Sequence, residues 1–317
     1  MSSRSSRPAA RVAASPSRAR VEYELRVNRV IDHIRDHLAD ELSLDGLACI
    51  AAFSPFHFHR IFRAITGETL FGFVQRIRLE RAATALVLRR DESILAIALD
   101  HGFSAPATFA RAFRARFGMS ATAWRAGGAA RWRKHGKAIR KPGKASRGGT
   151  RHRRAMNTTT NVRVVSLPSY RVAYMRHVGA YGAHGIPELW QRMRVWMEAH
   201  GLLGPHSIAL GIGRDDPEVT APERLRYDAC VVVADAFEPD GHVNVTHVPG
   251  GRYAVREFVG TARDIGAAWE SLYRDWLPGS GFQPEDRPCL EVYRGDPAVD
   301  GKPGTFRCEL CVPVKPL

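Results

Sequence analysis

The chain has 317 residues, of which 44% are hydrophobic and 25% are charged, a balance typical of globular proteins. This length is about twice the ~150 residues of an average domain, which predicts two domains. No apolar run approaches the ~18 residues of a membrane-spanning helix, and this excludes a protein built on such helices. Five cysteines without a secretory apolar segment favour free thiols and a cytoplasmic location.

The net charge of +15 is distributed unevenly along the chain. Residues 1–160 contain 30 lysines and arginines against 12 aspartates and glutamates, whereas residues 161–317 contain 17 against 20. A strongly basic half beside a slightly acidic half predicts that the first half binds a polyanion and that the second half has a different role.

The first half divides into an arm and a helical segment. Residues 1–20 are rich in arginine and serine and poor in apolar side chains, which predicts a disordered basic arm. The pattern then becomes helical, and Val27, Val30 and Ile34, for example, are spaced to form one apolar stripe. We therefore expect an all-α domain over residues 21–126.

A change of composition separates this helical segment from the rest of the chain. Residues 127–160 are dominated by glycine, lysine and arginine, which is typical of a flexible basic linker. Residues 161–317 contain short β-branched and aromatic runs, interrupted by helical stretches near 186–200 and 264–277. This order predicts an α+β domain after the linker.

The helical segment repeats itself after 51 residues, so that Phe58 corresponds to Phe109 and Arg60 to Arg111. Each copy reads as a short apolar helix, a turn and a second helix that begins with proline. Proline suits that first position, because the N–H group it lacks would have no partner within the helix. The sequence therefore predicts two helix-turn-helix units.

Residues 43–82 and 94–125 resemble the DNA-binding domain of the AraC/XylS family of transcription regulators. The turn sequences Ala-Phe-Ser at 52–54 and Gly-Phe-Ser at 102–104, and the segment Arg-Leu-Glu-Arg-Ala at 78–82, have the spacing of that family. The resemblance implies two recognition helices in successive major-groove segments of double-stranded DNA. It also implies a promoter or operator as the target and RNA polymerase as a possible further partner.

The resemblance places the DNA-contacting positions on the two recognition helices. Arginine can bind the O6 and N7 atoms of guanine, although a basic residue can equally contact phosphate or lie on a solvated face. In the second helix residues 105–107 are Ala-Pro-Ala, so we expect the first helix to dominate base readout. The expected contact residues are Phe56, His57, His59, Arg60, Arg63, Thr108, Arg111 and Arg114.

The second half also repeats itself, with a shift of about 81 residues. Arg214-Asp215-Asp216-Pro217 corresponds to Arg294-Gly295-Asp296-Pro297, for example, and Asp228 corresponds to Glu309. Each copy reads strand, strand, helix, strand, strand. We expect a pseudo-twofold α+β domain with a groove between its two halves.

This pattern, which ends in Cys-Glu-Leu-Cys-Val-Pro-Val, resembles the GyrI-like effector-binding domain. The resemblance implies that a small, lipophilic or cationic effector binds between the halves, against aromatic rings and a carboxylate on the last strand. That carboxylate would be Glu309, which could alternatively pair with Arg307. The expected aromatic residues, for which core packing is the alternative role, are Tyr181, Trp190, Tyr253, Trp269, Tyr273 and Tyr293.

Enzyme, metal and cofactor signatures are not evident in the sequence. Cys308 and Cys311 form a Cys-x-x-Cys pair, but positions three apart on a strand point to opposite faces. His33 and His37 could share one helix face, yet no third metal ligand is evident. We therefore expect a transcription regulator without metal or cofactor. One alternative is a small-molecule hydrolase that uses Glu309 and a nearby tyrosine. The other alternative is an architectural DNA binder.

Overall fold

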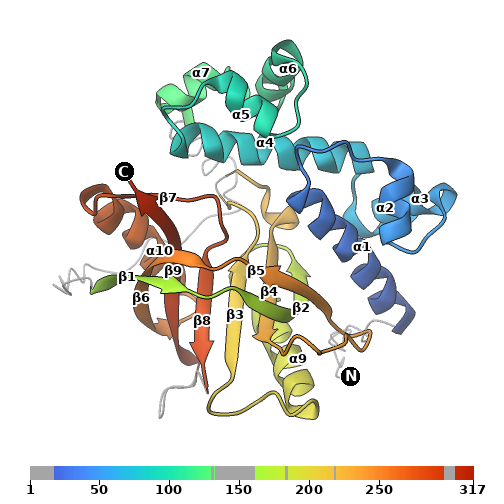
Figure 1. Ribbon diagram of the computed structural model, residues 1–317, viewed down its shortest axis with the longest axis vertical. Helices are drawn as coiled ribbons and strands as arrows, with labels where there is room; N and C mark the ends of the chain where they lie inside the picture. The colour runs from blue at the N-terminus through green and yellow to red at the C-terminus, as the bar shows by residue number, and fades with distance from the viewer. Residues whose placement is uncertain (1–17, 130–131, 133–160, 183–184, 218, 296–303) are drawn as a thin grey trace, which may run out of the picture.

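The computed structural model describes residues 18–129, 132, 161–182, 185–217, 219–295 and 304–317. Figure 1 shows a helical part and a part built on one large antiparallel sheet, with helix α4 lying across the end of the sheet and helix α1 running along its edge. No helix in the described part of the chain is both long and apolar enough to span a membrane.

The helical part consists of two helix-turn-helix units joined by the long helix α4. Each unit has its own apolar core, one around Phe58 and Phe62 and the other around Phe109 and Phe113. The helices are α1 (Arg18–Asp36), α2 (Leu44–Ile50), α3 (Pro55–Thr66), α4 (Leu70–Leu88), α5 (Ile94–Asp100), α6 (Pro106–Phe117) and α7 (Ala121–Ala123), followed by a π-helical turn, Trp124–Gly128.

The two turns of these units differ in backbone strain. Ala52 adopts a left-handed conformation with φ of +52°, which costs an L-residue ~1 kcal/mol, whereas the second turn has Gly102 at φ of +76°. A Cβ atom on Gly102 would lie 2.3 Å from the carbonyl oxygen of Leu38, so this position requires glycine.

The second part is an α+β domain whose strands follow the order β1-β6-β9-β8-β3-β4-β2-β5, with β7 paired to β9. Its elements are β1 (Val162–Leu167), β2 (Tyr170–Val178), α9 (Ile186–Ala199), β3 (Ile208–Gly213), β4 (Arg226–Val232), β5 (Asn244–Val248), β6 (Gly251–Thr261), α10 (Ile265–Ser271), β7 (Phe282–Pro284), β8 (Leu290–Arg294) and β9 (Thr305–Pro316), with short helical turns at Pro222–Arg224, Leu272–Trp276 and Leu277–Gly279.

Because side chains alternate along each strand, the sheet has two faces, and both carry buried side chains. One face carries the apolar cluster of Tyr174, Leu210 and Val292. On the other face, α9 packs over Tyr227 and Ala229, while α10 packs over strands β8 and β9. The helices α9 and α10 therefore cover the same side of the sheet and leave a space between them.

The sequence predicted most of these elements, with some differences at their boundaries. Residues 18–20 belong to α1 rather than to a disordered arm, and the rest of the predicted arm lies outside the described residues. Trp132, within the predicted linker, packs edge-on against Phe117 and at a tilt against Trp124, while residues 130–131 and 133–160 lie outside the described residues. The pattern strand, strand, helix, strand, strand accounts for β5 as the first strand of the second copy, whereas the short strand β7 was not predicted.

Candidate functional site

The first recognition helix, α3, begins where the sequence predicts. Ser54 is its N-cap and Pro55 its first residue, and Gly67 ends it in a left-handed conformation. Its buried face is apolar, with Phe58 and Phe62 fully enclosed. The exposed residues of the opposite face are His57, His59, Arg60 and Arg63.

The second recognition helix, α6, has the same length and the same proline and glycine ends. Ala105 precedes it and offers no capping side chain, in contrast to the capping serines of α2 and α5. Thr108, Arg111 and Arg114 are exposed. Eight contact residues were predicted, and the structure places seven of them on two exposed helix faces; the side chain of the eighth, Phe56, lies outside the described set.

A cavity of about 2210 Å³ lies between the sheet domain and the helical part. On the sheet side its walls come from α9, α10 and strands β3, β4 and β8, and on the helical side Arg35 of α1 and Ile77 and Thr84 of α4 also line it. Because both parts of the chain contribute to its walls, a molecule bound there can contact both.

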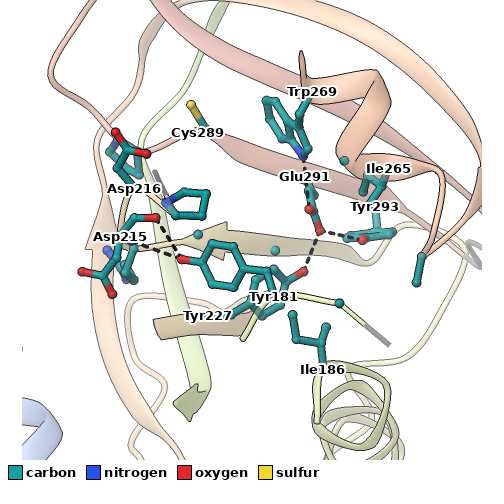
Figure 2. A pocket seen from close by; sticks show the side chains of 18 of the residues that line it. Tyr181, Ile186, Asp215, Asp216, Tyr227, Ile265, Trp269, Cys289, Glu291 and Tyr293 are labelled. Carbon is teal, nitrogen blue, oxygen red and sulfur yellow. Dashed lines mark hydrogen bonds between the residues drawn. The ribbon is translucent and has the colours of Figure 1, made fainter. Parts of the chain in front are cut away.

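Glu291 of β8 is the centre of the polar part of this cavity. Its carboxylate accepts hydrogen bonds from Tyr227 at 2.6 Å and Tyr293 at 2.9 Å, and Trp269 Nε1 lies at 3.5 Å (Figure 2). Trp190 donates to the Tyr227 hydroxyl and packs edge-on against Tyr293, with ring centroids 5.0 Å apart. One carboxylate thus lies within a wall of aromatic rings.

Burial controls the ionisation of this group of side chains. It raises the pKa of Glu291, although the hydrogen bonds from Tyr227 and Tyr293 oppose the shift. Burial and the charge of Glu291 also raise the pKa of both tyrosines well above the usual value, so that both remain protonated donors. A carboxylate that is costly to ionise alone is well placed to bind a cation.

Most of the predicted aromatic ligand residues line the cavity. Tyr181 is one of them, and its hydroxyl donates to the carbonyl oxygen of Arg226 at 2.7 Å. Tyr253 does not line it, because it points into the apolar core on the other face of the sheet and packs under Arg287. The predicted residues that line the cavity are Tyr181, Trp190, Trp269, Tyr273 and Tyr293.

Glu309, the predicted ligand carboxylate, lies outside the cavity lining. In the register of β8 and β9 it is opposite Val292, so it points to the other face of the sheet from Glu291. Its carboxylate pairs with Arg163 and Arg294 and not with Arg307, which lies 3.5 Å from Glu257 instead. The expected alternative pairing with Arg307 is therefore also not formed.

Sequence reasoning missed Glu291 and Tyr227 as cavity residues. The signal was available in Leu-Glu-Val-Tyr at 290–293, because alternation puts Glu291 and Tyr293 on one face of a strand. Tyr227 precedes the buried Asp228, and only the pairing of β3 with both β4 and β8 brings it beside Glu291.

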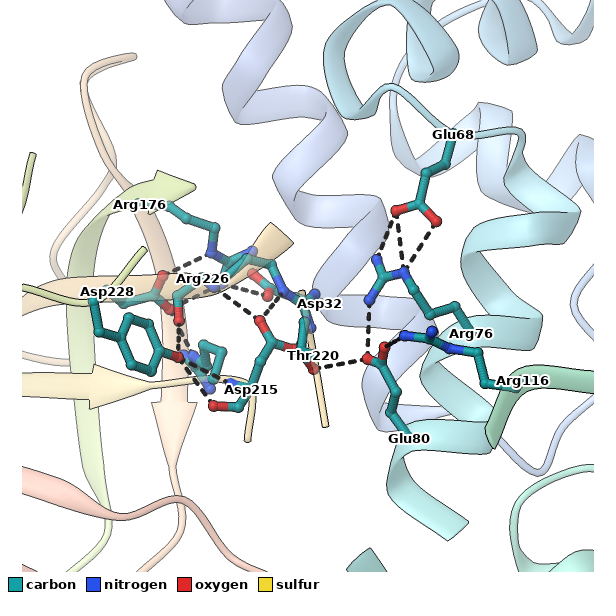
Figure 3. Close-up of polar contacts among 12 residues, drawn as sticks. Asp32, Glu68, Arg76, Glu80, Arg116, Arg176, Asp215, Thr220, Arg226 and Asp228 are labelled. Carbon is teal, nitrogen blue, oxygen red and sulfur yellow. Dashed lines mark hydrogen bonds and ion pairs between the residues drawn. The ribbon is translucent and has the colours of Figure 1, made fainter. Parts of the chain in front are cut away.

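Ion pairs connect the two parts of the chain (Figure 3). Arg176 of β2 lies 2.8 Å from Asp32 of α1 and 2.6 Å from the buried Asp228. Although burial alone would raise the pKa of Asp228, Arg176 and Arg214 lower it. Asp228 is therefore a charged centre of this junction.

A second set of contacts reaches the helix that joins the two helix-turn-helix units. Thr220 donates to Glu80 of α4 at 2.9 Å, and Glu80 also pairs with Arg76 and with Arg116 of α6. Val219 is packed in the core of the second helix-turn-helix unit. The sheet domain therefore contacts α4, the helix that joins the two helix-turn-helix units containing α3 and α6.

Metal-binding geometry is not formed within the described ranges, where no three His, Cys, Asp or Glu side chains gather in a suitable arrangement. Cys308 and Cys311 lie in apolar clusters on opposite faces of the sheet, as predicted from strand alternation. The rings of His33 and His37 stack at 4.2 Å.

Two family models match the chain. A helix-turn-helix domain matches residues 47–127, and a GyrI-like small molecule binding domain matches residues 160–315. The first range lies within the helical part and begins after α1, and the second range covers the strands and helices of the sheet domain.

Related proteins from three bacteria match a little less than half of this chain each. YosT of Bacillus subtilis, whose name describes a prophage-derived transcriptional regulator, is 30% identical, and the alignment covers 49% of this chain and 99% of YosT. YgiV of Escherichia coli, also named for transcriptional regulation, is 34% identical over 43% of this chain and 86% of YgiV. A DNA gyrase inhibitor of Serratia proteamaculans is 34% identical over 44% of this chain and 90% of that protein.

The chain therefore belongs to the GyrI-like family. It is a DNA-binding transcription regulator in which an AraC-type helix-turn-helix domain precedes a GyrI-like small-molecule binding domain.

Proposed function

We propose that the regulator senses a small lipophilic cation, which binds in the cavity against Glu291 and changes how the helix-turn-helix domain binds DNA. The observation that carries this proposal is the position of Glu291 among Tyr227, Tyr293 and Trp269. Its carboxylate supplies the negative charge, and the rings supply apolar contact and attraction between a cation and their faces.

The energetics favour a cation over a neutral ligand. Burial penalises the charged form of Glu291, as its raised pKa indicates, and a bound positive charge would offset that penalty. A charge-assisted contact contributes ~1.5 to 3 kcal/mol, and a cation over an aromatic face adds ~0.5 to 2 kcal/mol. These contributions are absent for a neutral molecule of the same size.

On the DNA side, we infer that α3 and α6 enter successive major-groove segments and that α3 supplies most of the base-specific contacts. The basis is chemical, because the exposed face of α3 carries arginine and histidine, whereas α6 begins with alanine and proline. RNA polymerase is inferred as a further partner at the promoter. The proposed DNA-contacting residues are Phe56, His57, His59, Arg60, Arg63, Thr108, Arg111 and Arg114.

Calorimetric titration of the full chain with two ligands of equal chain length tests the effector proposal. Octyltrimethylammonium should bind about ten- to a hundredfold more tightly than the neutral octanamide. Glu291→Gln keeps the shape of the side chain and should remove this preference. Glu309→Gln, a matched change on the opposite face of the sheet, should preserve it. Retention of the preference in Glu291→Gln would exclude Glu291 as the effector carboxylate.

We further infer that the bound effector leaves chemically unchanged, so that the chain is a regulator and not a hydrolase. The three hydrogen-bond donors around Glu291 are engaged in holding it, which suits binding. Octanoylcholine, an ester with a similar cationic head, tests this inference, because release of choline by the full chain above the uncatalysed rate would contradict it.

A further inference from the structure

A second polar region of the cavity lies where the two domains meet. Arg35, near the end of α1, and Arg214, directly after β3, both line the cavity and come from different domains. This region differs from the wall around Glu291, because two arginines line it beside the carboxylates of Asp215 and Asp216.

The carboxylates at this junction are already engaged. Asp228 accepts hydrogen bonds from Arg176 and from Nε of Arg214, the latter at 2.6 Å. Asp215 pairs with Arg226 and also accepts a hydrogen bond from the backbone N–H of Arg226 at 2.8 Å. Within the described residues, no carboxylate forms an ion pair with the remaining arginine, Arg35.

Both arginines retain buried donors without a protein partner. In the described part of the structure, Nε of Arg35 and Nη2 of Arg214 are buried and make no hydrogen bond. The side chain of Arg214 is only 9% exposed, so solvent does not substitute for a partner over most of it. A buried donor left unpaired costs ~1 to 3 kcal/mol, and more when it is charged.

The balance of charges at the junction also favours the binding of an anion. The charges of Arg35, Arg214 and Arg226 act on one another, and the neighbouring carboxylates of Asp215 and Asp228 already pair with Arg226 and with Arg176 and Arg214. Burial and the neighbouring charges of Arg214 and Arg81 lower the pKa of Arg35 well below its ordinary value. An additional negative charge at this place would relieve that repulsion.

We propose that this junction is an anion-binding site in which Arg35 and Arg214 together bind the carboxylate of a small amphiphilic molecule whose apolar chain lies in the cavity. A carboxylate fits because it offers two oxygens to two separate N–H donors. A single negative charge also fits better than a doubly charged phosphate, because Asp215 and Asp228 lie nearby. Since α1 contributes one arginine and the sheet domain the other, such a ligand links the two domains. The site does not depend on Glu291.

Octanoate and octanamide, two probes of equal chain length, test the site in titrations of the full chain. Octanoate should bind wild type about ten- to a hundredfold more tightly than octanamide. Arg35→Met, which keeps most of the apolar length and removes the charge, should abolish that difference, and Arg35→Lys should retain part of it. Arg194→Met is the matched control, because Arg194 also lines the cavity but is exposed on α9.

Further measurements separate this proposal from the cation site. Glu291→Gln should leave octanoate binding intact, and Arg35→Met should leave octyltrimethylammonium binding intact or strengthen it. Arg35→Met should also melt at a higher temperature than wild type, because it removes a buried charge without a carboxylate partner. Equal affinity of wild type for octanoate and octanamide, or unchanged octanoate affinity in Arg35→Met, would overturn the anion site.

Discussion

At the scale of single residues, Glu291 should make folding stability depend on pH in the direction opposite to an ordinary salt-bridged carboxylate. Burial raises its pKa in the folded chain above the ~4.3 of an unfolded glutamate. A raised folded pKa contributes stability that is fully present below the unfolded pKa and is lost as the pH rises through the folded pKa. As the pH rises, wild type therefore loses stability relative to Glu291→Gln, which cannot ionise at this position.

We predict that Glu291→Gln melts about 2–4 °C above wild type near neutral pH, the shift that ~1 kcal/mol produces in a domain of this size. The difference should shrink as the pH falls towards the unfolded pKa, because Glu291 then becomes protonated. Melting curves across this range check the prediction. For comparison, Glu309→Gln breaks partly exposed ion pairs with Arg163 and Arg294 and should lower stability by no more than about 1 kcal/mol. A melting-temperature difference between Glu291→Gln and wild type that grows on acidification would contradict a raised pKa for Glu291.

The sequence predicted a carboxylate among aromatic rings, but not the carboxylate that the structure places in the cavity wall. The predicted residue was Glu309 on the last strand, whereas Glu291 of β8 is the carboxylate that lies among tyrosine and tryptophan, and Glu309 faces the other way. Both glutamates lie between apolar residues, so local pattern alone does not distinguish them. The distinction comes from which face of the sheet α9 and α10 cover, and that depends on long-range packing.

At the scale of elements, the helices were predictable because their signals are local. Capping serines, prolines at the first helical position and apolar spacing all lie within a few residues of the helix they define. The pairing of strands is different. β1 pairs with β6 and β5 with β2, so residues far apart in the chain determine these pairings.

The difference between the two recognition helices leads to a prediction about base readout. Arg60→Ala should cost ~1 to 3 kcal/mol on a duplex selected by the wild-type protein and should relax the preference at one base position. Arg111→Ala should affect sequence preference less, because α6 offers fewer hydrogen-bonding side chains beside it. Binding selections with both variants measure this. A greater loss of specificity in Arg111→Ala than in Arg60→Ala would reverse the ranking.

At the scale of the whole molecule, the contact between the domains could not be predicted from the sequence. Asp32, Glu80 and Thr220 look like ordinary surface residues in the chain, and they become partners only when the domains pack together. Glu80 joins the sheet domain, α4 and α6 in one hydrogen-bonded group. Because the cavity walls include α1 and α4, a bound ligand can contact the DNA-binding domain directly.

The central proposal for the whole molecule is that occupancy of the cavity at Glu291 changes DNA binding. The direct measurement is the affinity of the full chain for a duplex selected by the wild-type protein, with and without saturating octyltrimethylammonium, in wild type and in Glu291→Gln. A coupling of ~1 to 3 kcal/mol predicts a change of roughly five- to 150-fold in wild type and little change in the variant. The same DNA affinity in wild type with and without the cation, at a concentration where calorimetry shows the cavity to be filled, would contradict the account.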